Sequence, residues 1–339
     1  MNRSDQRYYS ANWKFWSGLI ISALFLYLAF RKVHIPQTWA LIRTSDLLIL
    51  FLAVIVTFLQ FVIRTWRWRV FLDPLKKTGF VNRLFSVLIG FAANCILPAR
   101  MGEFIRANYI GQREGISGSS AFGTIVIERI FDGFTLLFFL MIGLMGKPFP
   151  ETSNNVSGNL KVTGLVMFLA YILIILFLSG FKYKTEMFLR MFKKLLFFLS
   201  TKVQSRIIHA IKNFSLGLVP IKNSREWAQA VFYSFLIWGL SLFQIQLIET
   251  SIGISLPFIA TFIILVMASF GVMIPSAPGY IGTFHLAVQY GFIFYGITKE
   301  EALSAAILWH AVSFFPTILF GIIAFLIVQI PYNRLSEKV

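Results

Sequence analysis

Two short segments decide the fold of this chain, ILPARMGE at residues 96–103 and MIPSAPGY at residues 273–280. Each has two aliphatic or methionine residues, then a proline, and a glycine four residues after that proline. Each also ends an apolar stretch, residues 84–97 or 257–274, that is short for a helix crossing a bilayer. Irregular backbone at membrane depth is tolerated only where protein or a wet cavity surrounds it. The pair therefore predicts two re-entrant or broken helical hairpins.

The composition is that of a membrane protein. Hydrophobic residues make up 57% of the 339 residues and charged residues only 13%, against about 25% in soluble domains. The formal net charge of +17 indicates, in so apolar a chain, anionic lipid headgroups and topology signals and not nucleic acid. The single cysteine, Cys95, excludes an intramolecular disulfide and a cysteine-based zinc site, and the four histidines have no metal-binding spacing. We therefore expect no metal and no cofactor.

Six further segments are long and apolar enough to cross a bilayer, which takes about 20 residues. They are Trp13–Phe30, Asp46–Ile63, Ala121–Gly146, Val162–Gly180, Trp227–Ile248 and Ala302–Ile330. Together with the hairpins they predict an all-α polytopic membrane protein with about six full transmembrane helices and two re-entrant hairpins.

Short proline-interrupted segments in corresponding positions of two halves indicate an inverted repeat with a site between the halves. With the N-terminus inside, 24 of the 31 Lys and Arg residues lie on the cytoplasmic side. The positive-inside rule then predicts a multi-pass protein of the inner (cytoplasmic) membrane with both termini in the cytoplasm. We expect one transmembrane domain over residues 1–339, with a first repeat at about 46–146, an amphipathic connector at about 181–226 and a second repeat at about 227–330.

The segment AFGTIVIERIFDGF (residues 121–134) places ionisable groups inside a predicted span. At 100° per residue Glu128 and Asp132 share a face with two threonines, and Arg129 borders that face. Such groups are expensive in a membrane unless they face a bundle interior or a wet cavity. The face either lines a cavity or holds helices together through a structural charge cluster. The net charge of −1 leaves one carboxylate for another partner or for protonation.

The segment LPARMGEFIRANYIGQR (residues 97–113) follows the first break. Arg100, Glu103 and Arg106 recur at every third residue, so Glu103 neutralises one arginine and leaves one guanidinium free. A guanidinium is a planar fork that suits phosphate, which makes an anionic headgroup a natural ligand. Pro98 suits a helix start, and Gly102 allows another backbone or a lipid to approach closely. The alternative is plain anchoring by positive charge at the inner interface.

The second break, PSAPGYIGTFH (residues 275–285), contains the prolines and glycines that enforce an extended backbone, Pro275, Pro278, Gly279 and Gly282. In the last span one small and polar face mirrors the Glu128 face of the first half; it consists of Ala306, His310, Ser313 and Thr317. His310 is either a functional residue of this face or a buried core histidine.

Basic residues interleaved with tryptophan follow the second predicted span. Arg64, Arg67 and Arg69 alternate with Trp66 and Trp68. This pattern is typical of an anchor at the membrane–water interface. Downstream, the connector combines apolar residues at helical spacing with many lysines, which predicts a basic amphipathic helix on the inner leaflet or a solvated connector.

The order of these motifs resembles one known family. LPARMGEFIRA, then ERIFDG, then PSAPGYIGTFH are similar to the flippase-like transmembrane domain of lysylphosphatidylglycerol synthases, as is RTWRWRVFL at residues 64–72. The resemblance covers about residues 10–330. It implies a polytopic domain that handles membrane lipids and, in some members, moves aminoacylated phosphatidylglycerol between leaflets.

Two features differ from the family pattern. The sequence has no soluble aminoacyl-transferase domain such as the bifunctional members carry, so we expect a stand-alone member without lipid aminoacylation. His310 stands where the resemblance leads us to expect an arginine, which puts in doubt whether the second half binds the same anionic group.

These features predict a lipid translocator or lipid-binding protein for an anionic phospholipid or glycolipid, and no enzyme. No GxxxxGK[ST] loop is present, so translocation would be passive or ion-coupled. The expected headgroup-binding residues are Arg100, Glu103, Arg106, Glu128, Arg129, Asp132 and His310. The alternatives are an intramembrane lipid-modifying transferase and a scaffold subunit of an envelope lipid or glycan synthesis complex. Expected partners are membrane lipids, a second copy of the chain or an envelope-synthesis enzyme.

Overall fold

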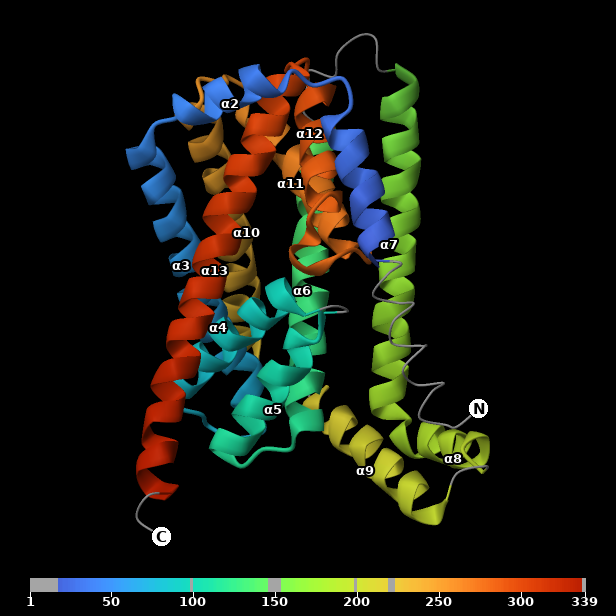
Figure 1. The fold of residues 1–339 in the computed structure, drawn as a ribbon. Coiled ribbons are helices and arrows are strands. Elements are labelled where there is room, and N and C mark those ends of the chain that lie inside the picture. Colours follow the sequence, from blue (N-terminus) through green and yellow to red (C-terminus); the bar gives the residue numbers. More distant parts are fainter. Residues whose placement is uncertain (1–17, 98–99, 146–153, 198–199, 219–222, 337–339) are drawn as a thin grey trace, which may run out of the picture.

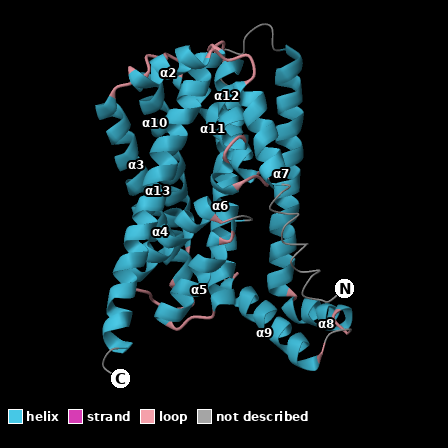
Figure 2. Cartoon of the chain, in the orientation of Figure 1, coloured by secondary structure: helices cyan, strands magenta, loops and turns pink. Residues whose placement is uncertain are grey.

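The computed structural model contains only helices as regular elements among the residues that it describes (Figure 2). The first described helix, Gly18–Phe30, turns by 87° into α2 (Ile35–Arg43), which lies across one end of the molecule (Figure 1). The all-α class predicted from the sequence is confirmed. The described residues are 18–97, 100–145, 154–197, 200–218 and 223–336.

Long helices run from one end of the molecule to the other (Figure 1). They are α3 (Leu47–Leu72), α6 (Gly118–Met145), α7 (Asn154–Tyr183), α10 (Ser224–Ser251) and α13 (Lys299–Ser336). By length and composition, α3, α10 and residues 299–328 of α13 can cross a membrane. α3 begins at Asp46, whose carboxylate accepts hydrogen bonds from the amides of Leu48 and Ile49. It runs on to Leu72, beyond the end at Ile63 predicted from the sequence.

Two hairpins of short helices enter the bundle from opposite ends (Figure 1). The first consists of α4 (Phe80–Ile96) and α5 (Gly102–Glu114), and the second of α11 (Phe258–Met273) and α12 (Thr283–Phe294). At 12 to 17 residues these helices are shorter than the roughly 20 residues that a crossing takes. The two predicted breaks therefore form re-entrant hairpins, although Pro98 itself lies outside the described residues.

Glycines allow the helices of the first hairpin to touch. A Cβ atom at Gly102 would overlap the carbonyl oxygen of Gly90 and lie 2.6 Å from the side-chain oxygen of Asn94. Asn94 accepts a hydrogen bond from the Gly102 amide at 2.8 Å, which satisfies a donor at the start of α5. Gly102, which the sequence analysis identified at this break, is therefore required for packing, because the backbones of α4 and α5 come too close for a side chain.

Helix contacts repeat between the two halves. α4 packs against α13 while α11 packs against α6, and α3 packs against α10. In the same way α5 contacts α6, and α12 contacts α13. Because the corresponding helices run in opposite directions, this is the contact pattern of an inverted repeat. The boundaries of the repeats, at about 46–146 and 227–330, stay a prediction.

The outer surface is apolar, as a lipid-facing surface must be. Large hydrophobic side chains such as Leu165 on α7 and Phe325 on α13 are exposed. The predicted connector contains two helices, α8 (Thr185–Leu195) and α9 (Thr201–Gly217), at the same end of the molecule as α5 (Figure 1). α9 packs against α6, where a Cβ atom at Gly217 would overlap the carbonyl oxygen of Ser120.

Candidate functional site

An arginine of α3 joins the two acidic residues of α6. The Nη1 atom of Arg67 lies 2.6 Å from Oδ1 of Asp132, and its Nη2 atom lies 3.6 Å from Oε1 of Glu128. The same Nη1 atom donates to the Ser234 hydroxyl of α10 at 3.0 Å. The Arg67 side chain has no exposed surface, so three helices converge on one fully buried guanidinium.

A second arginine reaches Glu128 from the first hairpin. The Nη1 atom of Arg106 in α5 lies 2.6 Å from Oε2 of Glu128. The guanidinium of Arg106 lies over the Trp68 ring, 3.8 Å from its centroid, which is the geometry of a cation–π contact. The indole nitrogen of Trp68 donates to the Thr124 hydroxyl at 2.9 Å. The Glu128 face of α6 therefore packs against arginine and tryptophan.

Asp132 is surrounded by cations. In addition to Arg67, its Oδ2 atom lies 3.2 Å from Arg129 and 3.9 Å from Arg64. The indole nitrogen of Trp238 donates to Oδ1 at 3.1 Å. Arg129 also lies 3.7 Å from Glu103. The charge cluster, as we call this group with the neighbouring Arg100, consists of Arg64, Arg67, Arg100, Glu103, Arg106, Glu128, Arg129 and Asp132.

One expectation from the sequence is corrected by this geometry. Arg64 and Arg67 are not interfacial anchors: they are buried in the cluster, because α3 continues past Ile63 as a helix inside the bundle. Arg69 keeps the expected surface position, with a side chain 63% exposed and an ion pair to Asp73. The α6 carboxylate that the sequence left for another partner or for protonation has cationic neighbours, since Arg64, Arg67 and Arg106 supply partners from outside α6.

The tips of the two hairpins meet beside the cluster. Arg100 and Tyr280 both have left-handed backbone conformations, with φ of 54° and 58°, which residues other than glycine rarely adopt. The side chains of Arg100 and Tyr280 line the same small cavity. Glycines complete the second break, Gly279 with φ of 76° and Gly282 with φ of 93°. Strained residues of this kind concentrate at functional sites.

Two adjoining cavities open at this meeting point. The smaller, which we call the arginine compartment, has a volume of about 120 Å³, and its polar lining includes Arg100, Glu103, Arg106, Arg129 and Tyr280. The larger, the central cavity, has about 520 Å³ and shares Arg100 and Arg129 with it. Gln60, Asp132, Trp238 and Gln244 also line the central cavity, and most of its other lining residues are apolar. Both hairpins and all five long helices contribute to its lining.

His310 lies apart from the arginines. Its Nε2 atom is 2.8 Å from the carbonyl oxygen of Gly279, and its ring stacks on Phe314 at 4.8 Å between centroids. The ring of His285 follows at 4.7 Å. His310 thus supports the second break and is not among the residues that line the two cavities. Among the described residues no three His, Cys, Asp or Glu side chains are grouped to hold a metal ion.

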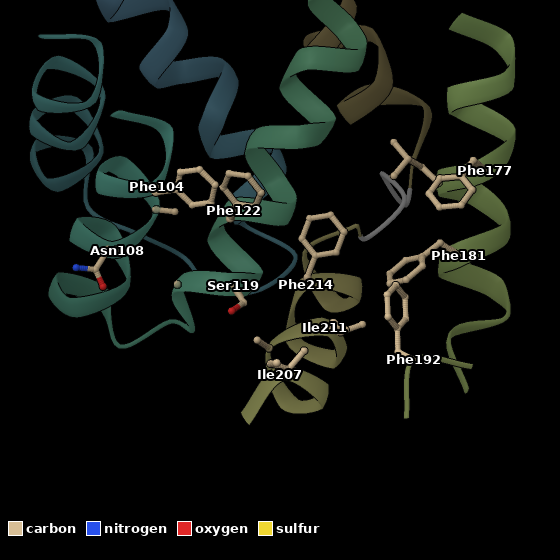
Figure 3. Close-up of a pocket in the computed structure, with 14 residues that line it drawn as sticks. Phe104, Asn108, Ser119, Phe122, Phe177, Phe181, Phe192, Ile207, Ile211 and Phe214 are labelled. Carbon is tan, nitrogen blue, oxygen red and sulfur yellow. The ribbon is translucent and has the colours of Figure 1, made fainter. Parts of the chain in front are cut away.

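A third cavity, the aromatic pocket, lies between α5, α6, α7, α8 and α9 and has a volume of about 720 Å³. Figure 3 shows Phe104 and Phe122 on one side of it and Phe177 and Phe181 of α7 on the other. Phe104 and Phe122 stack at 4.5 Å between centroids. The lining is almost entirely apolar, so this pocket suits a hydrocarbon chain and not a headgroup.

Comparison with known proteins agrees with this picture. The sequence profile described as "Lysylphosphatidylglycerol synthase TM region" matches residues 15–321. A UPF0104 membrane protein of Pyrococcus horikoshii is 24% identical over 85% of this chain and 90% of its own length. A UPF0104 membrane protein of Methanocaldococcus jannaschii is 25% identical over 94% of this chain and 96% of its own. The glycosyltransferase AglD of Haloferax volcanii is 20% identical over 95% of this chain, but the match covers 55% of that protein.

Proposed function

The chain belongs to the lysylphosphatidylglycerol synthase transmembrane family, and from that premise we propose that it moves an anionic lipid between the two leaflets of a membrane. The observation that carries this proposal is the charge cluster at the meeting point of two opposed hairpins, where it borders two cavities. Ionisable groups at membrane depth are costly and mark pathways for polar substrates. A headgroup that crosses about 30 Å of hydrocarbon has to keep polar partners throughout.

The central cavity has the two-part lining that a lipid needs. Its arginines offer donors to an anionic headgroup, while its apolar walls tolerate the glycerol and upper chains. The aromatic pocket adds room for a hydrocarbon chain beside the basic helices α8 and α9. In inverted-repeat transporters, alternating access comes from rocking or gating of one repeat against the other around a fixed site. Motion of one hairpin relative to the other would expose the cavity to one leaflet at a time.

An enzymatic role is the second candidate, favoured by the name of the Haloferax relative. A transferase of this kind needs a carboxylate that is free to act as a base. Here Glu128 and Asp132 are both held by arginines at distances as short as 2.6 Å. Glu103 is the least constrained acid of the cluster, 3.7 Å from Arg129. The ion pairing therefore favours binding and translocation over acid–base chemistry.

We expect purified protein in liposomes to accelerate movement of at least one fluorescent anionic lipid, from a set that includes phosphatidylglycerol and phosphatidic acid, but not of phosphatidylcholine. Arg100→Gln should slow the anionic lipid about tenfold, because a hydrogen bond to a charged group contributes about 1.5–3 kcal/mol and 1.4 kcal/mol is a factor of ten. A dithionite reduction assay measures the rates. Arg113→Gln, at the exposed far end of α5, is the matched control.

The outcomes separate the candidates. Rates equal to those of empty liposomes for every lipid, with and without a proton gradient, would refute translocation and leave a scaffold role. Transfer of a sugar from a nucleotide donor to lipid by the same vesicles would support the enzyme. Equal slowing by Arg100→Gln and Arg113→Gln would remove the first hairpin tip from the site.

The proposed orientation has both chain termini, α8 and α9 on the cytoplasmic side, because most lysines and arginines then lie there. In a Cys95→Ser background we expect Asn154→Cys to react with an impermeant thiol reagent added outside cells. Ser224→Cys should react only after permeabilisation. The reverse labelling pattern would invert the proposed direction of both hairpins.

A further inference from the structure

The positive and negative charges of the charge cluster do not cancel. It contains five arginines and three acidic side chains, so its formal charge is +2. Arg67 and Arg106 are buried and paired with carboxylates, whereas Arg129 is 31% exposed and Arg100 is half-buried. The surplus charge therefore lies on guanidinium groups that a bound anion can reach, and such an anion would compensate it through charge-assisted hydrogen bonds.

The arginine compartment shows where that negative charge fits. Among the residues that the structure describes, the Nε atoms of Arg100, Arg106 and Arg129 have no hydrogen-bond acceptor, nor does the Nη2 atom of Arg106. All three side chains line the compartment, and Glu103 is the one acid in its lining. Its volume of about 120 Å³ corresponds to roughly four water molecules at about 30 Å³ each. A phosphate group fits this space, whereas a whole lipid headgroup does not.

The two kinds of lipid phosphate differ in what they bring to this site. A phosphodiester, as in phosphatidylglycerol, has one negative charge and is substituted on both sides. A terminal phosphomonoester has three free oxygens and close to two negative charges above its second pKa of about 6. Three guanidinium groups around one small compartment match three free oxygens, since each guanidinium binds oxygen pairs through a planar fork.

We propose that the lipid recognised here ends in a phosphomonoester, whose two negative charges neutralise the +2 of the charge cluster. This inference rests on the proposed function and specifies its substrate class. The terminal phosphate occupies the arginine compartment, between the tips of the two hairpins. The remainder of the lipid extends into the adjoining central cavity, whose walls are mostly apolar. A diester would enter the compartment with an extra substituent and leave one positive charge without a partner.

The test compares two lipids that differ by one methyl group and one charge. Dioleoyl phosphatidic acid has a terminal phosphate, and dioleoyl phosphatidylmethanol is its monoanionic methyl ester. Affinities of both for the detergent-purified full chain are measured by native mass spectrometry at pH 8, where the monoester is doubly ionised. We expect phosphatidic acid to bind at least tenfold more tightly. Inorganic phosphate is the third ligand, and dioleoyl phosphatidylcholine is the zwitterionic reference with no net charge.

Two variants test whether the preference for phosphatidic acid arises in the arginine compartment. Arg100→Gln, at the hairpin tip just before α5, should reduce the preference for phosphatidic acid to less than threefold. Arg113→Gln should keep it unchanged, because Arg113 is exposed and outside the cluster. A preference that survives Arg100→Gln would place the terminal phosphate elsewhere and overturn the assignment to this compartment.

The other possible results separate failure of the phosphomonoester inference from failure of the proposed function. Equal affinity for phosphatidic acid and phosphatidylmethanol, both above phosphatidylcholine, would overturn the phosphomonoester inference and leave an anionic-lipid translocator. Inorganic phosphate that competes as strongly as phosphatidic acid would show a site for soluble phosphate and overturn lipid recognition. Equal binding of all three lipids would contradict the proposed function itself.

Discussion

Replacing Arg67 with methionine is expected to lower the free energy of unfolding by about 3–5 kcal/mol, because it leaves buried carboxylates without their shared partner. Arg67 contacts Asp132 at 2.6 Å and Glu128 at 3.6 Å, and none of its side chain is exposed. Methionine is shorter but flexible and fills irregular space in cores, so we expect the loss of charge to contribute more than the space left behind. Unfolding in mixed detergent micelles, followed by circular dichroism, measures the change.

Arg69→Met is the matched control for this prediction. Arg69 lies two residues further along α3, and its ion pair with Asp73 is largely exposed. Exposed ion pairs contribute about 0–1 kcal/mol, so this variant should unfold almost as the unchanged chain does. Equal stability of Arg67→Met and Arg69→Met would show that Arg67 is not a structural centre of the cluster.

The hairpins were predictable because their signals are local. A proline that ends a short apolar stretch, with a glycine four residues later, is a pattern within one segment, and its repetition in the second half indicated the inverted arrangement. The acidic face of α6 was visible for the same reason, since Glu128 and Asp132 are one helical turn apart. The structure places both on the buried side of α6, as the sequence predicted.

The partners of that face were not predictable in the same way. Arg67 is 65 residues away from Asp132 along the chain, and basic residues with tryptophans after an apolar run are also the pattern of an interfacial anchor. One signal separates the two interpretations: Arg64, Arg67 and Trp68 lie on one face of a continued helix, while Trp66 and Arg69 lie outside it. The arginine partners of Glu128 and Asp132 could therefore be predicted only if α3 was known to continue past Ile63.

The predicted correspondence between the two halves holds for the backbone and not for the charges. His310 takes the position that the sequence assigned to the second polar face, yet it contacts the backbone of Gly279 and not an acidic or basic group. The arginines and carboxylates all come from the first half of the chain. We infer that the first hairpin binds the polar group while the second, with its extended break, acts as the opposing wall.

Replacing Gly102 with alanine is expected to lower stability by about 1–3 kcal/mol or more, because α4 and α5 have to separate to accept one methyl group. The new Cβ atom would overlap the carbonyl oxygen of Gly90 and lie 2.6 Å from Oδ1 of Asn94. Backbone atoms cannot rotate away as a flexible side chain can. Arg100 and Arg106 flank this contact, so we also expect loss of lipid movement in vesicles. Thermal unfolding and the dithionite assay measure the two effects.

Gly239→Ala shows what the same substitution does where space is available. A Cβ atom at Gly239, inside α10, would meet no heavy atom of the described residues within 4 Å. Alanine is about 1 kcal/mol more favourable than glycine in a helix, so this variant should be as stable as the unchanged chain or more so. A stable Gly102→Ala protein that still moves lipid would show that the hairpin opens at little cost. The close contact of α4 with α5 would then be one state of a mobile tip, and the arginines beside it would reach the headgroup by moving with α5.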